Sequence, residues 1–342
     1  MVGNYHRGGT VFLCEVFLTM DRRKFTFTAT VLGLGSAVYG ASAFSLPASK
    51  KRIGIVGLDS SHAIAFTKEL NANLANENYQ GYQVVAAYPM GSPSIPLNAE
   101  RIPKFTEEIK KFNVEIVSSI DSLLKKVDVV LLETNDGNLH LQQAEIILRA
   151  KKPLFIDKPI ANSYQDALKI FELADRYKTP LFSTSSLRYI GGIEEINKQN
   201  VLGADIYSPA YTEPSHKDLY WYGIHGVEML FTLLGPNCVS VQTQHTTDFD
   251  LYVGEWQGGR IGTLRGIRKG ADGFGGRVFT QDEIVNLGAF QGYNPLLKQI
   301  VSFFDTGKVP VDRAETLAIC KFIDAAHQSR LGGGTKVILN NK

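Results

Sequence analysis

The chain has little of three things: cysteine, excess charge of one sign, and long apolar runs. It holds three cysteines among 342 residues, and they lack the spacing of a zinc site. Its 36 lysines and arginines nearly balance 34 aspartates and glutamates, so the basic field that nucleic-acid binding needs is missing. After residue 50 no apolar run approaches the ~20 residues of a membrane span. The sequence therefore predicts a soluble body, without a zinc module or a nucleic-acid-binding surface.

The cysteines do not identify the cellular compartment. Cys14 lies in the predicted leader described below, and Cys320 sits within the helix-like run TLAICKFI, where a buried thiol is expected. A disulfide between Cys238 and Cys320 remains open on this reasoning.

Residues 1–49 are predicted to be an export signal and leader. The pair Arg22-Arg23 precedes a mildly apolar run, TFTATVLGLGSAVYGASAF, whose last part holds the small-x-small pattern of residues 41–43. A positive start, a short apolar middle and such an end are typical of a cleaved signal, and paired arginines are typical of the twin-arginine route. We expect a mature chain that begins near Phe44 and lies in the periplasm; the alternative is an uncleaved membrane anchor.

Between residues 50 and 185, apolar runs of strand length alternate with amphipathic segments of helix length. The strand-like runs are RIGIVGL, YQVVAAY, VEIV, VDVVLLET, PLFID and PLFST. Strands that are apolar throughout and are separated by helices indicate a parallel sheet covered on both faces. Ser163 and Asp166 are expected to cap the helix at 164–177. The predicted fold class is therefore α/β, with a doubly wound Rossmann sheet.

Residues 186–342 follow a different pattern, which predicts an α+β domain with an open, mostly antiparallel sheet. A helix-like GIHGVEMLFTLLG precedes the strand-like runs CVSVQTQHTT, DLYVGEWQ, RIGTLRGIRK and GRVFTQ. Gly258-Gly259 indicates a hairpin between two of them. Two helices, near 294–305 and 312–329, and a short VILN strand close the chain. We expect this domain to carry the substrate and to form a homo-oligomer through its sheet.

The stretch GIVGLDSSH resembles a nucleotide-binding turn in which two glycines are replaced. Gly57 stands at the first place of G-x-G-x-x-G, Asp59 at the second and His62 at the third. A carboxylate at the second place repels phosphate unless it points away. From spacing alone, a helix start capped by Ser60 or Ser61 explains the stretch equally well. Either way, the helix start offers amide donors to an anion.

The second strand lacks the acidic residue that holds the adenine ribose in NAD sites. YQVVAAY runs instead into PMGSP, where Gly91 and Ser92 offer donors for a 2′-phosphate. This favours NADP over NAD.

Two further segments carry candidate chemistry. Asp157-Lys158-Pro159 follows the buried run PLFI, and a lysine at the carboxyl end of a central parallel strand faces the crevice where such sheets bind ligands. His225 and Glu228 lie three residues apart on a predicted helix of the second domain, and so share a face.

Together these segments resemble the Gfo/Idh/MocA family, the group of glucose–fructose oxidoreductase and inositol dehydrogenase. The resemblance covers nearly all of residues 51–340, through the glycine turn, KKPLFIDKPIA, the arginine in SSLRY, GIHGVEMLFTLLG and the closing helix and strand. It implies a Rossmann domain that binds NAD or NADP, an open-sheet domain that bears the substrate, and hydride transfer at a sugar or cyclitol carbinol.

The resemblance also implies roles for single residues. Lys158 matches the lysine that contacts substrate hydroxyl and cofactor, and His225 matches the histidine that shuttles the hydroxyl proton. Arg188 takes the place of a family arginine after the sixth strand, and Glu228 that of an acid one turn after the histidine. Both are predicted to bind substrate. Trp221 stands where the family often has an aspartate, so the acid–base details depart from the pattern.

The predicted contacts form two sets. Those with the cofactor are Gly57, Asp59, Ser60, Ser61, His62, Gly91, Ser92, Thr134, Asn135, His140, Asp157 and Lys158. Those with the substrate, besides Arg188 and Glu228, are His216, Tyr220, Trp221 and Tyr222, all within EPSHKDLYWYGIH. His216 has no fixed spacing to His225 and Glu228, so no metal site is predicted.

The function expected from the sequence is an exported NAD(P)-dependent oxidoreductase of a small carbohydrate. Three alternatives stay open. One is a glycosidase that oxidises its sugar transiently with bound cofactor, and another is a pseudoenzyme that binds a sugar or a partner without cofactor. A third is a metal-dependent hydrolase built on His216, His225 and Glu228.

Overall fold

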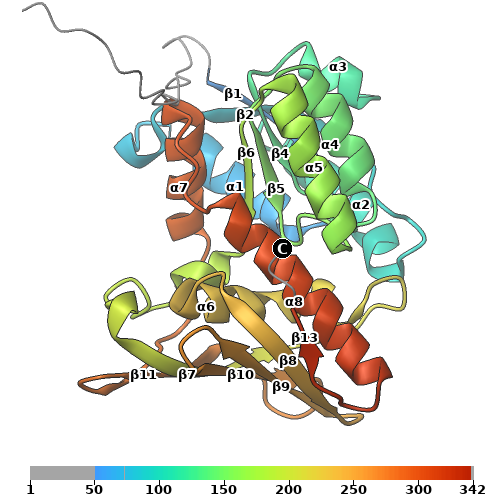
Figure 1. The fold of residues 1–342 in the computed structure, drawn as a ribbon. Coiled ribbons are helices and arrows are strands. Elements are labelled where there is room, and N and C mark those ends of the chain that lie inside the picture. Colours follow the sequence, from blue (N-terminus) through green and yellow to red (C-terminus); the bar gives the residue numbers. More distant parts are fainter. Residues whose placement is uncertain (1–50, 73, 340–342) are drawn as a thin grey trace, which may run out of the picture. The chain divides into compact units, whose positions relative to one another are not determined.

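The computed structural model describes residues 51–72 and 74–339, which form one compact unit built on two sheets (Figure 1). The predicted export signal, with Arg22, Arg23 and the 41–43 pattern, lies outside these residues. Within the described part of the chain, no helix is long and apolar enough to cross a membrane.

The first sheet has six parallel strands, as predicted, and their order is β3-β2-β1-β4-β5-β6. Its strands are β1 (Arg52–Val56), β2 (Gln83–Tyr88), β3 (Glu115–Ile116), β4 (Val129–Leu132), β5 (Leu154–Asp157) and β6 (Leu181–Thr184). The connecting helices are α1 (Ser61–Ala72), α2 (Pro96–Lys110), α3 (Ile120–Leu124), α4 (His140–Arg149) and α5 (Tyr164–Tyr177).

Both faces of this sheet are covered, which explains why its strands are apolar throughout. Leu132 and Ile156 point into an apolar cluster with α3, α4 and α5. Leu131 and Phe155 point the other way, into a second cluster with α1 and a later helix, α7 (Asn294–Thr306). Figure 1 shows these two helix layers on opposite sides of the strands.

The predicted cap of α5 is confirmed. The Ser163 side chain accepts a hydrogen bond from the backbone N–H of Asp166 (3.1 Å) and donates to its carboxylate (3.0 Å).

The second sheet has seven strands in the order β12-β11-β7-β10-β9-β8-β13. They are β7 (Val201–Pro209), β8 (Cys238–His245), β9 (Phe249–Trp256), β10 (Arg260–Ile267), β11 (Gly275–Thr280), β12 (Ile284–Asn286) and β13 (Val337–Ile338). All pairings are antiparallel except β7 with β10, and Gly258-Gly259 forms the predicted hairpin with positive φ at both residues. The α+β prediction for this half is confirmed, although β7 was not expected from the sequence.

Helices α6 (Ile224–Leu234) and α8 (Arg313–Leu331) belong to the same apolar cluster as this second sheet. Helix α7 instead returns to the first sheet, where the ring of Phe303 lies 4.9 Å from that of Phe182. The sequence left open a disulfide between Cys238 and Cys320. Both are buried free thiols, so no disulfide joins them.

Candidate active site

A cavity of about 230 Å³ lies at the carboxyl edge of the first sheet, where the start of α1 meets α6 and the segment before α7. It is lined by Ser60, Ser61, His62, Leu97, Arg101, Asn135, Lys158, Ser186, Leu187, Trp221, Tyr222, His225, Phe274, Phe290 and Tyr293. Of the predicted residues, eight therefore share one cavity, and they come from both predicted contact sets.

The glycine turn has the backbone that a phosphate-binding turn needs. Gly57 has φ of +92°, and a Cβ there would lie 2.4 Å from the backbone nitrogen of Thr134, so only glycine fits. Helix α1 begins at Ser61, and Ser60 accepts a hydrogen bond from the N–H of His62 (3.1 Å). The first amides of a helix have no intrahelical acceptor and can donate to an anion.

The carboxylate of Asp59 points away from this turn. It is fully buried, accepts a hydrogen bond from the backbone N–H of Asn135 (2.8 Å), and lies so close to Gly91 that a Cβ there would be 1.8 Å from Oδ2. Burial raises the pKa of Asp59 to about 6, and the negative charge of Asp136 adds to the rise, although hydrogen bonds from backbone amides oppose it. Asp59 therefore supports the loop after β4 rather than facing the cavity.

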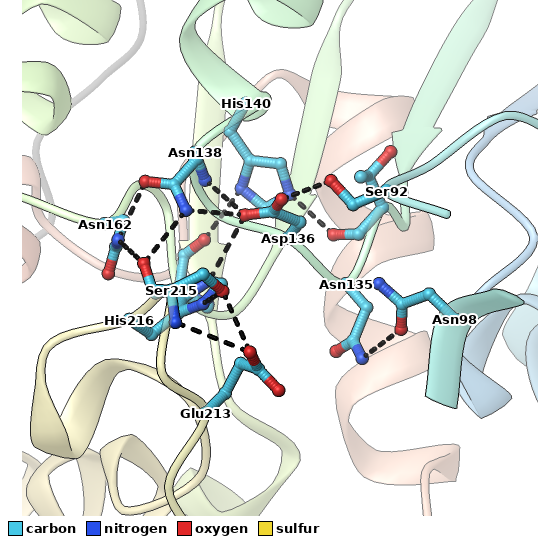
Figure 2. Close-up of polar contacts among 12 residues, drawn as sticks. Ser92, Asn98, Asn135, Asp136, Asn138, His140, Asn162, Glu213, Ser215 and His216 are labelled. Carbon is cyan, nitrogen blue, oxygen red and sulfur yellow. Dashed lines mark hydrogen bonds and ion pairs between the residues drawn. The ribbon is translucent and has the colours of Figure 1, made fainter. Parts of the chain in front are cut away.

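Four predicted cofactor contacts do not line the cavity: Ser92, Thr134 and His140 are buried, and Gly91 is half-buried. Figure 2 shows Ser92 and His140 among their partners. The hydroxyl of Ser92 donates to Asp136, so it is not free to donate to a 2′-phosphate as predicted, and the carboxylate of Asp59 lies against Gly91. Both nitrogens of His140 face backbone carbonyl oxygens, at 2.6 Å from Thr134 and 2.8 Å from Pro159. His140 thus ties the loop after β4 to the loop after β5, and Thr134 is fully buried beside it.

Lys158 reaches the cavity from the end of β5, as predicted, with 6% of its surface exposed. The preceding residue, Asp157, is buried below it and faces Nδ1 of His62 at 3.0 Å. Burial alone would raise the pKa of Asp157, but the facing His62 and Lys158 outweigh it and lower the pKa to about 2.

His225 reaches the same cavity from the first turn of α6. Its Nδ1 lies 2.6 Å from the Oγ of Ser185, which leaves Nε2 for a ligand. Burial lowers the pKa of His225 well below the ordinary histidine value, and the charges of Lys158 and His62 lower it further. The ring packs edge-on against Tyr222, 5.1 Å between centroids. His225 is therefore neutral at pH 7.

Three predicted substrate contacts lie elsewhere. Arg188 binds the carboxylates of Glu228 (2.7 Å) and Glu315 (2.6 Å) in a buried network, and neither Arg188 nor Glu228 lines the cavity. Tyr220 is fully buried and its hydroxyl donates to the carbonyl oxygen of Cys320 (3.1 Å). The prediction for these three residues is corrected accordingly: each is held by protein partners inside the core.

His216 is also held away from the cavity. Figure 2 shows it beside Asp136, with Nε2 3.3 Å from the carboxylate. The amides of Asn138 and Asn162 donate to the carbonyl oxygen of Ser215 (3.3 and 3.1 Å). These contacts join the loop after β7 to loops of the first sheet, so His216 belongs to a connection between the two halves.

Several cavity residues were missed by the sequence reasoning. Arg101 projects from α2 and donates to the backbone oxygen of Asp59 (3.3 Å), and Tyr293 packs its ring 4.6 Å from that of His62. The others are Leu97, Ser186, Leu187, Phe274 and Phe290. The seven residues reach the cavity from four separate segments through the tertiary fold, and only Ser186 and Leu187 lie in a motif named above, SSLRY.

Comparison with protein families gives one match. Residues 51–185 match the Gfo/Idh/MocA family, described as "Oxidoreductase family, NAD-binding Rossmann fold". The matched segment contains the first sheet and its helices, and it covers less than half of the chain. The predicted enzyme class, oxidoreductase, is confirmed. Among curated protein sequences, none matches the chain significantly.

Solved structures extend the likeness over both sheets. Myo-inositol dehydrogenase from Lactobacillus casei, solved with NAD(H) and myo-inositol, has a TM-score of 0.68 at 15% identity and covers 86% of this chain and 98% of its own. Scyllo-inositol dehydrogenase from the same organism gives 0.67 at 13%, covering 85% and 99%. UDP-N-acetylglucosamine 3-dehydrogenase from Acidithiobacillus ferrooxidans gives 0.64 at 18%, covering 82% and 97%. At these identities the similarity establishes the fold.

The residues at the turn fit a dinucleotide. Gly57 provides the close backbone approach, the amides at the start of α1 are positioned for phosphate, and the carboxylate of Asp59 is turned aside. Lys158 and Asn135 would then hold the nicotinamide end, since both line the cavity.

Proposed function

We propose that this protein is an NAD(P)-dependent oxidoreductase that acts on a carbinol of a sugar or cyclitol. The observation that carries the proposal is that Lys158 and His225, on elements from the two halves of the chain, line one cavity at the start of α1. The substrates named for the similar solved structures, myo-inositol and scyllo-inositol, support the substrate class.

A bound nicotinamide would supply the hydride acceptor for such a carbinol. The hydroxyl proton must then leave, and a neutral His225 can take it at Nε2 when its Nδ1–H donates to Ser185. Lys158, as a cation beside the reacting oxygen, stabilises its alkoxide character. The same Lys158 charge disfavours a protonated His225, so the ring would pass the proton on to solvent.

The other lining residues suit a small polyhydroxylated ring. Trp221, Tyr222 and Phe274 offer aromatic faces, and Arg101 offers hydrogen-bond donors. The cavity of about 230 Å³ is smaller than the ~300–1,000 Å³ typical of sites for drug-sized ligands, so a single ring fits its size better than an oligosaccharide.

Titration with NAD and with NADP, followed by a screen of cyclitols and monosaccharides for absorbance of the reduced cofactor, tests the proposal. We expect NAD to bind more tightly, because Ser92 is bonded to Asp136 and the carboxylate of Asp59 covers Gly91. Failure of both cofactors to bind at millimolar concentration would leave a carbohydrate-binding protein. Turnover of a glycoside without added cofactor would instead support the transient-oxidation glycosidase.

A further inference from the structure

Three potential metal ligands meet below the floor of the cavity, at the carboxyl ends of three neighbouring strands. His62 stands in the first turn of α1, just after β1; Glu133 follows the last residue of β4; and Asp157 ends β5. These strands are adjacent in the order β1-β4-β5. One ligand atom from each residue lies within 4.8 Å of the other two.

Glu133 is the residue that needs an explanation. It is fully buried, and neither carboxylate oxygen has a hydrogen-bond partner among the described residues. Its backbone N–H donates to the carbonyl oxygen of Val56 (2.7 Å), which fixes its position at the end of β1. A buried polar group without a partner costs about 1–3 kcal/mol, and more when it is charged. The buried carboxyl of Glu133 therefore lowers the stability of the fold, since no described protein donor compensates for its loss of water.

Glu133 is also close to two further carboxylates, Asp157 and Asp59, and to the cationic side chain of Lys158. His62, which faces Asp157, adds a ring nitrogen to this group. Acidic groups gathered in this way attract a divalent cation.

A proton on Glu133 is the competing explanation, and it fits the geometry less well. Protonation removes the charge but creates a buried O–H that also needs an acceptor, and neither oxygen of Glu133 has a hydrogen-bond partner among the described residues. A metal ion would satisfy Glu133 together with the facing pair of His62 and Asp157.

The donor set also limits the kind of metal. One imidazole nitrogen and two carboxylate oxygens suit zinc, manganese or iron, whereas calcium and magnesium prefer oxygen donors only. Donors bound to a tetrahedral zinc at about 2.0–2.2 Å lie about 3.3–3.6 Å apart. The three donor atoms lie within 4.8 Å of one another, so they must move closer to bind one ion. Glu133 is free of hydrogen bonds that would oppose this movement.

We propose that His62, Glu133 and Asp157 bind one divalent first-row transition cation. His62 also lines the cavity, so the cation would lie next to the space in which the proposed substrate and cofactor bind. This site goes beyond the proposed oxidoreductase function, which uses Lys158 and His225.

Metal content of the full chain, purified without chelator, tests the site directly. Elemental analysis should find about one zinc, manganese or iron per chain. Removal by a strong chelator should lower the melting temperature, because a ligand that binds only the folded state stabilises it. Zn²⁺ or Mn²⁺ should restore the melting temperature, and Mg²⁺ at the same concentration should not. None of these readouts needs a cofactor or a substrate, so the result is separate from that of the proposed function.

The variant Glu133→Gln removes one ligand with little change of shape, and it should bind Zn²⁺ or Mn²⁺ at least about tenfold more weakly by calorimetry. The matched control is His245→Asn, which removes another histidine paired with a buried aspartate, Asp250, in the second sheet. This control should bind metal as the native chain does.

Two results would overturn the proposal. One is a native chain that carries no transition metal and gains no thermal stability from added Zn²⁺ or Mn²⁺. The other is a folded Glu133→Gln chain that binds either ion as tightly as the native chain. If Glu133→Gln does not fold, the native measurement decides alone.

Discussion

The Oγ atom of Ser185 lies 2.6 Å from Nδ1 of His225, and this contact joins the end of β6 to helix α6. Ser185 also accepts a hydrogen bond from the backbone N–H of Leu187 (3.0 Å), which fixes the direction of its hydroxyl. The orientation of the His225 ring is thus set by the first sheet, although the residue itself lies on a helix that packs against the second.

Replacement of His225 by alanine should reduce turnover by about 10²–10⁴-fold, the usual contribution of a general acid–base group. Cofactor affinity should stay close to native, and Ser185→Ala should show a smaller loss, about fivefold for one hydrogen bond of about 1 kcal/mol. Steady-state kinetics and cofactor titration measure both. Near-native turnover of His225→Ala would make Tyr222 the better candidate for the base.

Replacement of Lys158 by alanine should reduce turnover at least as much as loss of His225, and should also weaken cofactor binding. Lys158→Arg is the matched variant: it keeps the charge, but the planar guanidinium cannot occupy the position of a compact ammonium in a cavity of this size. We expect Lys158→Arg to remain impaired in stopped-flow measurement of the hydride step. Full activity of Lys158→Arg would show that only the charge matters.

Asp59 should give folding stability a distinct pH dependence. Its pKa is about 6 in the folded chain against an ordinary value of 3.8, so its charge destabilises the fold above pH 6 by about 3 kcal/mol. As the pH falls from 6 to 4, the folded state takes up the proton before the unfolded state does, and stability rises. Urea denaturation at several pH values should show this rise in the native chain but not in Asp59→Asn. Parallel curves for the two proteins would contradict the assignment.

Gly91→Ala should destabilise the chain, because the added Cβ would lie 1.8 Å from Oδ2 of Asp59. Overpacking of this kind costs about 1–3 kcal/mol. Asp59→Gly in the same chain removes the obstructing atoms, so the double variant should lose less stability than the two single losses added together. Simple additivity in thermal denaturation would show that the two residues are not coupled.

Glu228→Gln should lower stability by about 3–5 kcal/mol, the cost of breaking a buried ion pair from one side, because Arg188 loses one of its two carboxylates. KM should stay close to native at temperatures well below melting, since Glu228 does not line the cavity. A large rise in KM without loss of stability would return Glu228 to the substrate contacts.

The sequence was sufficient for the fold class, and the two residues it assigned to catalysis, Lys158 and His225, line one cavity. Apolar strands and amphipathic helices identify a parallel sheet because both faces must be covered. Lys158 could be placed because the carboxyl end of a central parallel strand faces the ligand crevice. His225 could be placed because it begins a helix in the segment GIHGVEMLFTLLG, which resembles the family segment that carries a catalytic histidine.

Glu228 shows where such reasoning fails. Residues three apart on a helix point in directions that differ by about 60°, and every residue of α6 is buried. His225 and Glu228 therefore face different partners, and only the tertiary structure reveals that Arg188 meets the second of them. Arg101 and Tyr293 were missed for a similar reason. The sequence pattern around each predicts only a helix, α2 or α7, and does not show that the helix lies beside the cavity.

The return of α7 to the first sheet has a consequence for synthesis of the chain. Phe182 and Phe303 meet across about 120 positions, and the apolar face that holds Phe155 and Phe182 is closed by Ile300, Phe303 and Phe304. A ribosome that has just released residues 51–185 has therefore made a nucleotide-binding sheet with one face still partly bare. That face stays partly exposed until α7 (Asn294–Thr306) has been synthesised. Until then its exposed apolar surface can bind a chaperone. The first sheet is thus synthesised early, but one of its faces is completely covered only after α7 has been made.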